Sequence, residues 1–300
     1  MLTLCLVVVV GYVAERCGFF SEDFTNRLSR LIVQITCPAL ILSSVMGGEL
    51  PDRHLIMPLL GVSIASYIVI TVVAIALARL CAANGDSHTR NSIAFMTIFG
   101  NVGFIGYPVC HALYGPQAVF YASILNFPNT LWVFTIGTML ISGEKIHDAS
   151  ALFKALLRPG CIASYISIII VVFGIQNLPG WLCNATRLVG DITVPGSLIV
   201  IGSSMAKMSI RKMLGDPLAY ASATLRLLIA PVVVYLLCLV IPCTPFIRNI
   251  NMLVFAMPVA SFGTMLCYTY KRDPSLMTAT TFITTVISLV SIPLLQYFLT

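Results

Sequence analysis

Apolar residues run along the chain in long blocks that short polar stretches separate. Each block holds about 18–25 mostly apolar residues, the length a helix needs to cross a hydrocarbon core of about 30 Å. The stretches between blocks carry turn and breaker residues, as in GGELPD, AANGDS, YGPQ, QNLPG and KRDP. The pattern predicts ten membrane-spanning helices, at about residues 1–17, 24–46, 54–80, 90–114, 117–142, 152–175, 183–206, 217–242, 248–270 and 275–299.

Composition supports a membrane protein and excludes a soluble domain. Of the 300 residues, 58% are hydrophobic and 9% are charged, whereas soluble domains carry about 25% charged residues. The net charge of +6 does not indicate a nucleic acid partner, because Lys and Arg do not gather into one stripe. The stretch Met1–Ala14 lacks a basic start and a small-residue cleavage site, so it is expected to be a first spanning helix rather than a signal peptide.

The distribution of Lys and Arg predicts the orientation in the membrane. Thirteen of them flank one set of loops, and only Arg53, Arg187 and Arg248 flank the other. The positive-inside rule places the first set in the cytoplasm, and both termini then lie outside. Arg226, near the start of the eighth segment, is expected to extend to the cytoplasmic surface.

The chain shows signs of an internal duplication. Three pairs of stretches match in order and at similar spacing: 31–38 with 188–195, 90–91 with 248–249, and 123–128 with 288–293. The matches predict an N-terminal five-helix repeat at 1–142, a cytoplasmic linker at 143–151 and a C-terminal five-helix repeat at 152–300. Because five is odd, the second repeat enters the membrane from the opposite side, which is the inverted arrangement of many secondary transporters.

Two of the predicted helices contain residues that interrupt a helix. The fourth segment has FGNVGFIGYP at 99–108, and the matching part of the ninth has FAMPVASFG at 255–263; in this register Gly100 falls opposite Pro258 and Gly103 opposite Ser261. Interrupted backbone survives in a membrane only when it is packed in protein or lines a wet cavity.

A pair of such breaks predicts an anion site, because half-helix N-termini attract negative charge. The anion can thus be held without a fixed Lys or Arg, and the sequence is expected to place none there. The candidate substrate-binding residues are Asn101, Gly100, Gly103, Gly106, Pro108, Pro258, Val259, Ser261, Thr264, Asn126, Asn129 and Thr130. Two alternatives stay open: the glycines serve close helix packing and the prolines are simple kinks, and the polar residues of the fifth segment make hydrogen bonds between helices.

The residues of three segments resemble a known family. FGNVGFIGYP, LSRLIVQITCPALILSS and SLVSIPLL are similar to the auxin efflux carrier family, which includes plant PIN carriers and bacterial permeases associated with malate and malonate. The resemblance implies an all-α polytopic membrane protein with ten transmembrane helices in two inverted repeats. Helices 4 and 9 would be broken and crossing, helices 1, 2, 6 and 7 a scaffold, and helices 3–5 and 8–10 a transport domain that moves in an elevator-like way.

The resemblance also carries over two residue roles. Asn101 aligns with the substrate-contacting Asn of the family, and Pro258 with the crossover proline of helix 9. Gly100 stands where the plant proteins have Pro, and the central loop has only about ten residues. Both departures favour a compact prokaryotic permease over an auxin carrier.

Three further polar residues are candidates for ion or proton coupling: Asp191, Gln34 and His111. Asp191 lies inside an apolar segment, where an ionised carboxylate is costly and often functional. An ion pair with Arg187, one turn earlier, is the structural alternative for Asp191, and packing or capping is the alternative for His111. Gln34 matches Asp191 in the repeat and is neutral.

The sequence therefore predicts a secondary active transporter of a small organic anion, a mono- or dicarboxylate, in a bacterial inner membrane with periplasmic termini. No enzyme activity, cofactor, metal or nucleic acid partner is expected; a homodimer and a disulfide between Cys183 and Cys243 stay open. The closest alternative is a sodium-coupled symporter of the bile-acid type, which needs clustered oxygen ligands for a cation. A membrane-embedded enzyme or a sensor is a more distant alternative, because the sequence shows neither a catalytic constellation nor an output segment.

Overall fold

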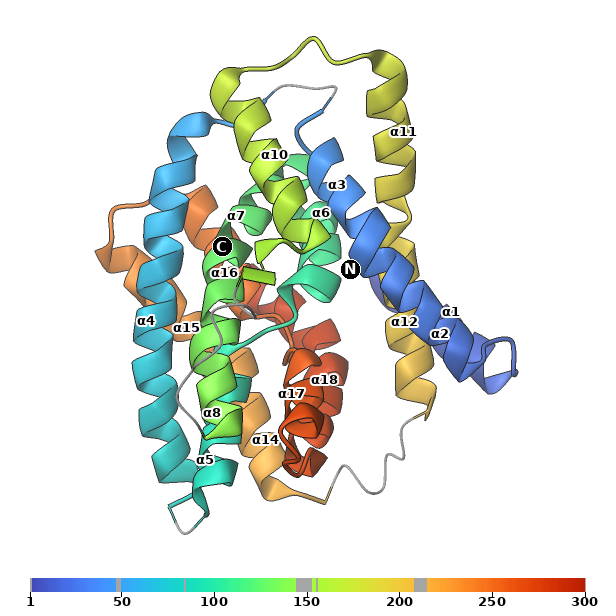
Figure 1. Cartoon of the computed structure of the whole chain (residues 1–300). Helices are drawn as coiled ribbons and strands as arrows, with labels where there is room; N and C mark the ends of the chain where they lie inside the picture. The colour runs from blue at the N-terminus through green and yellow to red at the C-terminus, as the bar shows by residue number, and fades with distance from the viewer. Residues whose placement is uncertain are drawn as a thin grey trace. The chain divides into compact units, whose positions relative to one another are not determined.

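The computed structural model describes residues 2–46, 50–83, 85–143, 153–154, 156–207 and 215–299. These residues form helices joined by short connections, and their only β-type pairing is one isolated bridge (Figure 1). The prediction of an all-α polytopic membrane protein is confirmed. The predicted linker lies outside the described residues, apart from Gly143.

The helices follow the predicted segments closely. In chain order they are α1 (Leu2–Arg16), α2 (Glu22–Leu31), η1 (Ile32–Thr36), α3 (Cys37–Ser43), η2 (Arg53–Leu55), α4 (Ile56–Cys81), α5 (Ser87–Ile98), η3 (Val102–Gly106), α6 (Tyr107–Tyr114), α7 (Pro116–Trp132), η4 (Val133–Gly137), α8 (Thr138–Ser142), α10 (Pro159–Phe173), α11 (Gly180–Asp191), α12 (Thr193–Lys207), α14 (Pro217–Thr224), η5 (Leu225–Ile229), α15 (Ala230–Val240), α16 (Pro245–Phe255), α17 (Phe262–Thr269) and α18 (Ser275–Leu299).

Five continuous helical stretches are long and apolar enough to cross a membrane. They are Arg53–Cys81, Pro116–Ser142, Gly180–Ala206, Pro217–Val240 and Ser275–Phe298. The protein is therefore an integral membrane protein. The count of ten spans and the inverted order of the repeats stay predictions.

Several π-turns interrupt the regular helices, and prolines account for most of them. The π-helical segments η1, η3 and η5 each end shortly before a proline, at Pro38, Pro108 and Pro231. Proline has no N–H to donate and its ring crowds the carbonyl four residues earlier, so the preceding turn widens instead of closing as an α-helix. Each π-turn redirects the side chains that it carries.

The described residues group into two compact units. The first comprises Met1–Ile56, Gly103–Ile124 and Leu156–Met208, and the second comprises Met57–Val102, Leu125–Ala155 and Ser209–Thr300. Predicted helices 1, 2, 6 and 7 fall in the first unit and helices 3, 8, 9 and 10 in the second. The division differs from the scaffold and transport sets implied by the resemblance, because residues 103–124 group with the first unit. Within that unit the Tyr121 hydroxyl accepts a hydrogen bond from Asp52 N at 2.8 Å, and Cys37 Sγ donates to Gly103 O at 3.5 Å.

In the first unit, α1 packs lengthwise against α12, and glycines allow the close approach. A Cβ on Gly202 would lie 2.7 Å from Tyr12 N, and one on Gly11 would lie 2.7 Å from the Cα of Ile199. Helix α3 packs against α10 and α11, where a Cβ on Gly190 would lie 2.8 Å from the Cα of Leu40. Small residues at such contacts let the two backbones approach closely. Van der Waals packing then stabilises the helix pair in lipid, where no hydrophobic driving force acts between helices.

A hydrogen bond in the first unit joins two residues that the duplication makes equivalent. Thr193 Oγ1 donates to Thr36 Oγ1 at 2.9 Å, and both side chains are buried. The two residues hold the same place in the matching stretches 31–38 and 188–195. Contact between equivalent positions is expected where a pseudo-two-fold axis passes; the duplication itself stays a prediction.

In the second unit, α15 packs against α16 and α14 against α18, while α17 contacts α8 and α18 (Figure 1). Aromatic side chains fill the interior: the rings of Tyr67 and Phe255 lie 4.8 Å apart, as do those of Phe95 and Phe99. This packing surrounds the interrupted parts of α5 and α16.

Candidate functional site

Two helices of the second unit stop in mid-segment and their continuations pair. Helix α5 ends at Ile98 and α16 ends at Phe255. Beyond these ends Gly100 forms an antiparallel bridge with Val259. Asn101 N donates to Pro258 O at 2.8 Å, and Ala260 N donates to Phe99 O at 3.1 Å. We call the paired residues 99–101 and 258–260 the crossing; the predicted interruptions are therefore observed.

The pairing at the crossing is itself symmetric. Superposing 99–101 on 258–260, residue by residue, carries Gly100 onto Val259 and exchanges the two hydrogen bonds with each other. Any antiparallel pair has this local symmetry, so the pairing does not test the repeat register, which set Gly100 opposite Pro258 and stays a prediction. Backbone hydrogen bonds set the observed pairing of Gly100 with Val259.

Arg226 fills the space beside the crossing, and the expectation that it reaches the cytoplasmic surface is wrong. It lies in the π-turn η5, and its side chain is 1% exposed. Nε donates to Met257 O at 2.7 Å, Nη1 donates to Thr97 O at 3.0 Å and Ile98 O at 2.9 Å, and Nη2 donates to Val254 O at 3.4 Å. The expectation that no cation lies at the breaks is wrong for the same reason.

The acceptors of Arg226 are the carbonyl groups at the ends of α5 and α16. The last carbonyls of a helix have no partner within it, and each helix C-terminus carries about half a negative charge. One guanidinium therefore neutralises two helix ends. Among the described side chains no acidic group forms an ion pair with Arg226.

Gly100 is the residue that leaves room for this guanidinium. A Cβ at position 100 would clash with Nη2 of Arg226, and Cζ would be 2.8 Å away. A Cβ at Gly103, by contrast, meets nothing within 4 Å. Close packing therefore explains Gly100 and not Gly103.

Other predicted residues of the second unit lie on α7 and around α17. Asn129 Nδ2 donates to Asn126 Oδ1 at 2.8 Å, and Thr130 Oγ1 donates to Asn126 O at 3.0 Å, so these bonds stay within one helix. Asn129 Oδ1 is buried without a hydrogen-bond partner. Ser261 is exposed, whereas Asn101 and Thr264 are half-buried.

The remaining predicted residues belong to the first unit. Gly106 and Pro108 lie at the junction of η3 and α6. Asp191 is exposed at the end of α11 and forms no ion pair with Arg187, so the structural alternative for Asp191 is wrong. His111 is half-buried on α6. Gln34 is exposed.

Two residues at the crossing were missed by sequence reasoning. Arg226 was seen but assigned to a surface, although a lone Arg shortly before a proline in an apolar segment was a usable signal. Thr284 gave no signal, because α18 contains several threonines; its Oγ1 accepts a hydrogen bond from Val259 N at 3.2 Å and donates to Thr280 O at 2.7 Å.

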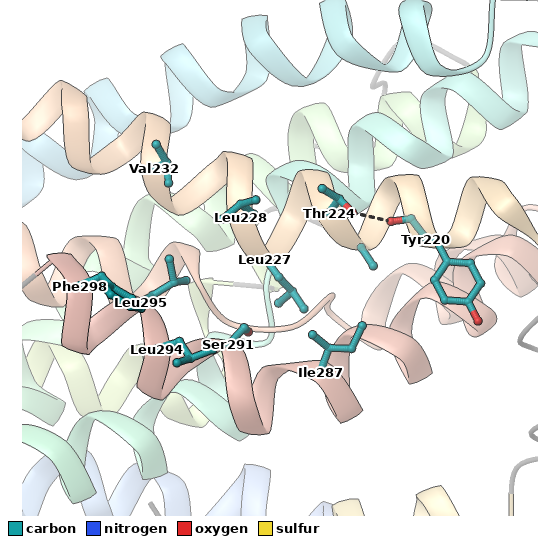
Figure 2. Close-up of a pocket in the computed structure, with 11 residues that line it drawn as sticks. Tyr220, Thr224, Leu227, Leu228, Val232, Ile287, Ser291, Leu294, Leu295 and Phe298 are labelled. Carbon is teal, nitrogen blue, oxygen red and sulfur yellow. Dashed lines mark hydrogen bonds between the residues drawn. The ribbon is translucent and has the colours of Figure 1, made fainter.

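A separate apolar pocket of about 540 Å³ lies between α14–α15 and α18. Figure 2 shows its lining, in which Leu227 from the stretch α14–α15, and Leu295 and Ile287 from α18, point into the space between these two stretches. None of the predicted site residues lines it, and Leu228, Leu294 and Phe298 are largely exposed. Its lining offers no charge to a polar ligand, so we do not assign it to the candidate site.

The cysteines and other ligand-type side chains give no sign of a metal site or disulfide in the described part of the chain. Cys183 and Cys243 are both free thiols, so the disulfide left open by the sequence is absent. No group of three His, Cys, Asp or Glu side chains is gathered among the residues described.

Comparison with known proteins gives one family. A family described as "Membrane transport protein" matches residues 1–151 and 147–296. An uncharacterized transporter of Methanocaldococcus jannaschii is 23% identical over 300 residues, which cover 98% of this chain and 96% of the relative. An uncharacterized transporter of Methanothermobacter thermautotrophicus is 24% identical over 295 residues, which cover 98% of this chain and 95% of the relative.

Proposed function

Because the chain belongs to the membrane transport protein family, also called the auxin efflux carrier family, we propose that it is a secondary active transporter of a small organic anion. The substrate class is a mono- or dicarboxylate, bound at the crossing and carried by elevator-like alternating access. Membership of the family makes the protein a transporter; the substrate, the movement and the energy source belong to the proposal.

The balance of charge at the crossing carries the proposal of an anion. Two interrupted helices leave two C-terminal and two N-terminal ends near the paired segments. Arg226 neutralises the C-terminal ends of α5 and α16, while the chain restarts as helix at Val102 and Phe262. Each of these N-termini carries about half a positive charge and donor N–H groups. What remains at the crossing suits a carboxylate.

Within this site Asn101 is proposed to orient the substrate. Its backbone N–H is committed to Pro258 O, and its side chain is half-buried directly before the restart of helix at Val102. An amide in that position offers both a donor and an acceptor. Ser261 and Thr264, which flank the start of α17, are proposed to add hydroxyl contacts.

The proposal is tested by uptake into proteoliposomes with a panel of labelled mono- and dicarboxylates. Asn101→Ala is expected to abolish uptake while membrane expression stays normal, and Asn184→Ala, at an exposed position on α11, is the matched control. Full uptake by Asn101→Ala would remove Asn101 from the site. Absence of uptake of every acid by the wild-type protein would overturn the substrate class.

Proton coupling through Asp191 is a separate part of the proposal. Asp191 at the end of α11 and His111 on α6 both belong to the first unit, and we propose that the two residues together offer a route for a proton. Asp191→Asn is expected to flatten the dependence of uptake on external pH. A pH profile identical to that of the wild-type protein would exclude this role.

A further inference from the structure

Four backbone carbonyl oxygens converge on one point beside the crossing. They belong to Thr97 and Ile98 at the end of α5 and to Val254 and Met257 at and after the end of α16, and all lie within 3.4 Å of a guanidinium nitrogen of Arg226. We call this set the carbonyl cluster. Oxygen atoms of unwound backbone and of half-helix C-termini are the groups with which transporters bind coupling cations.

The carbonyl cluster needs a cation for electrostatic reasons. Two helix C-termini contribute about one negative charge in total, and Phe95, Phe99 and Phe255, which lie at these ends, are fully buried. Buried carbonyl groups left there without a partner would destabilise the fold. A single positive charge with several donors satisfies the charge and the hydrogen bonds together.

In this protein the cation is part of the chain. The π-turn η5 directs Arg226 inward, Gly100 leaves the space that its Nη2 needs, and the Cζ atom lies 5.9 Å from the ring centre of Phe255. A guanidinium offers five N–H donors in a fixed plane. The side chain is 1% exposed, so the guanidinium is shielded from solvent.

We propose that Arg226 is a fixed counter-cation: its guanidinium occupies the carbonyl cluster in place of an exchangeable ion, so the anion is carried without a co-bound sodium ion. The sodium-coupled alternative requires oxygen ligands for a cation. Such oxygens are present at the crossing, and they are already used by Arg226. The part of this inference that concerns transport rests on the proposed function; the part that concerns the cation does not.

The role of Arg226 as the cation of the carbonyl cluster is tested by thermal unfolding of the purified full chain in detergent. Arg226→Ala is expected to lower Tm, and low-millimolar methylguanidinium chloride is expected to restore about 3–8 °C of the loss by binding the vacated cluster. The matched control is Arg248→Ala, which removes another Arg of the same unit whose Cζ packs over Tyr235 at 5.1 Å. Methylguanidinium should change the Tm of this control and of the wild-type protein by less than it changes that of Arg226→Ala. An equal change in all three would overturn the proposal.

A second pair of variants covers the case in which Arg226→Ala does not fold. Arg226→Lys keeps a positive charge with fewer donors, and Arg226→Gln keeps hydrogen-bond donors without charge. A fixed counter-cation predicts the higher Tm for Arg226→Lys. A Tm for Arg226→Gln equal to or above it would overturn the role of the charge.

Sodium dependence is tested on the wild-type protein. Replacing NaCl by choline chloride at equal concentration is expected to leave both Tm and uptake of the accepted acid unchanged. A higher Tm in NaCl, or uptake driven by a sodium gradient, would overturn this inference. Neither result would contradict an anion as the substrate. Failure of every acid in the panel would overturn the proposed function, and the Tm results with methylguanidinium would still decide the role of Arg226.

Discussion

Gly100 shows how one missing side chain positions a charge. Its Cα faces the guanidinium of Arg226, and the same position is extended backbone paired with Val259. A larger residue there would displace the guanidinium from the helix ends that it neutralises. The glycine is therefore matched to the arginine, although the two are far apart in the sequence.

Gly100→Ala is expected to lower the free energy of unfolding by about 1–3 kcal/mol, because the added methyl group overpacks a buried contact. Gly103→Ala is the control, since a Cβ at Gly103 meets no atom within 4 Å. Thermal unfolding in detergent measures both. If Gly100→Ala is no less stable than Gly103→Ala, the guanidinium does not lie where we place it.

Helix packing in the first unit also depends on the absence of side chains, at glycines where two helices meet. The contact of α1 with α12 places Gly202 and Gly11 against backbone atoms of the other helix. Backbone cannot rotate away as a side chain can, so the helix itself must move when a methyl group is added.

Gly202→Ala is accordingly expected to destabilise the protein by about 1–3 kcal/mol, measured as a decrease in Tm. Gly61→Ala, in α4, is the matched control because a Cβ there meets nothing within 4 Å. Similar Tm values for the two variants would show that α1 and α12 are not in close contact.

The hydrogen bond between Thr193 and Thr36 offers a second test of helix packing. Removal of one hydroxyl leaves the other buried with one partner fewer, so Thr36→Val and Thr193→Val are each expected to cost about 1 kcal/mol. The double variant should cost less than the two single variants together. Additive losses would show that the π-turn η1 and α12 do not meet at this pair.

At the scale of the whole molecule the orientation in the membrane stays a prediction that native cysteines can test. Cys17 and Cys81 are exposed beside loops predicted to be cytoplasmic, and Cys183 and Cys243 lie near loops predicted to be outside. In variants that keep one of these cysteines, a membrane-impermeant maleimide is expected to label Cys183 or Cys243 in intact spheroplasts. Cys17 and Cys81 should react only after permeabilisation, and the reverse pattern would invert the topology.

The sequence alone determined where helices form and where two of them break. Blocks of apolar residues dictate spanning helices because lipid cannot satisfy a free backbone, and the Gly and Pro residues of FGNVGFIGYP and FAMPVASFG disfavour a regular, uninterrupted helix. These are local rules, so the helix bounds and both interruptions followed from residue types without any contact being known.

Only the tertiary structure decided what lies at the interruption. In the sequence Arg226 is one cation at the edge of an apolar block; in the fold it meets carbonyl groups from residues 97–98 and 254–257. Its partners are backbone carbonyl oxygens, which every residue carries, so they cannot be predicted from residue types. The register of the crossing likewise depends on hydrogen bonds between two segments that lie in opposite halves of the chain. Such pairings are set by packing of the whole second unit, and no local pattern encodes them.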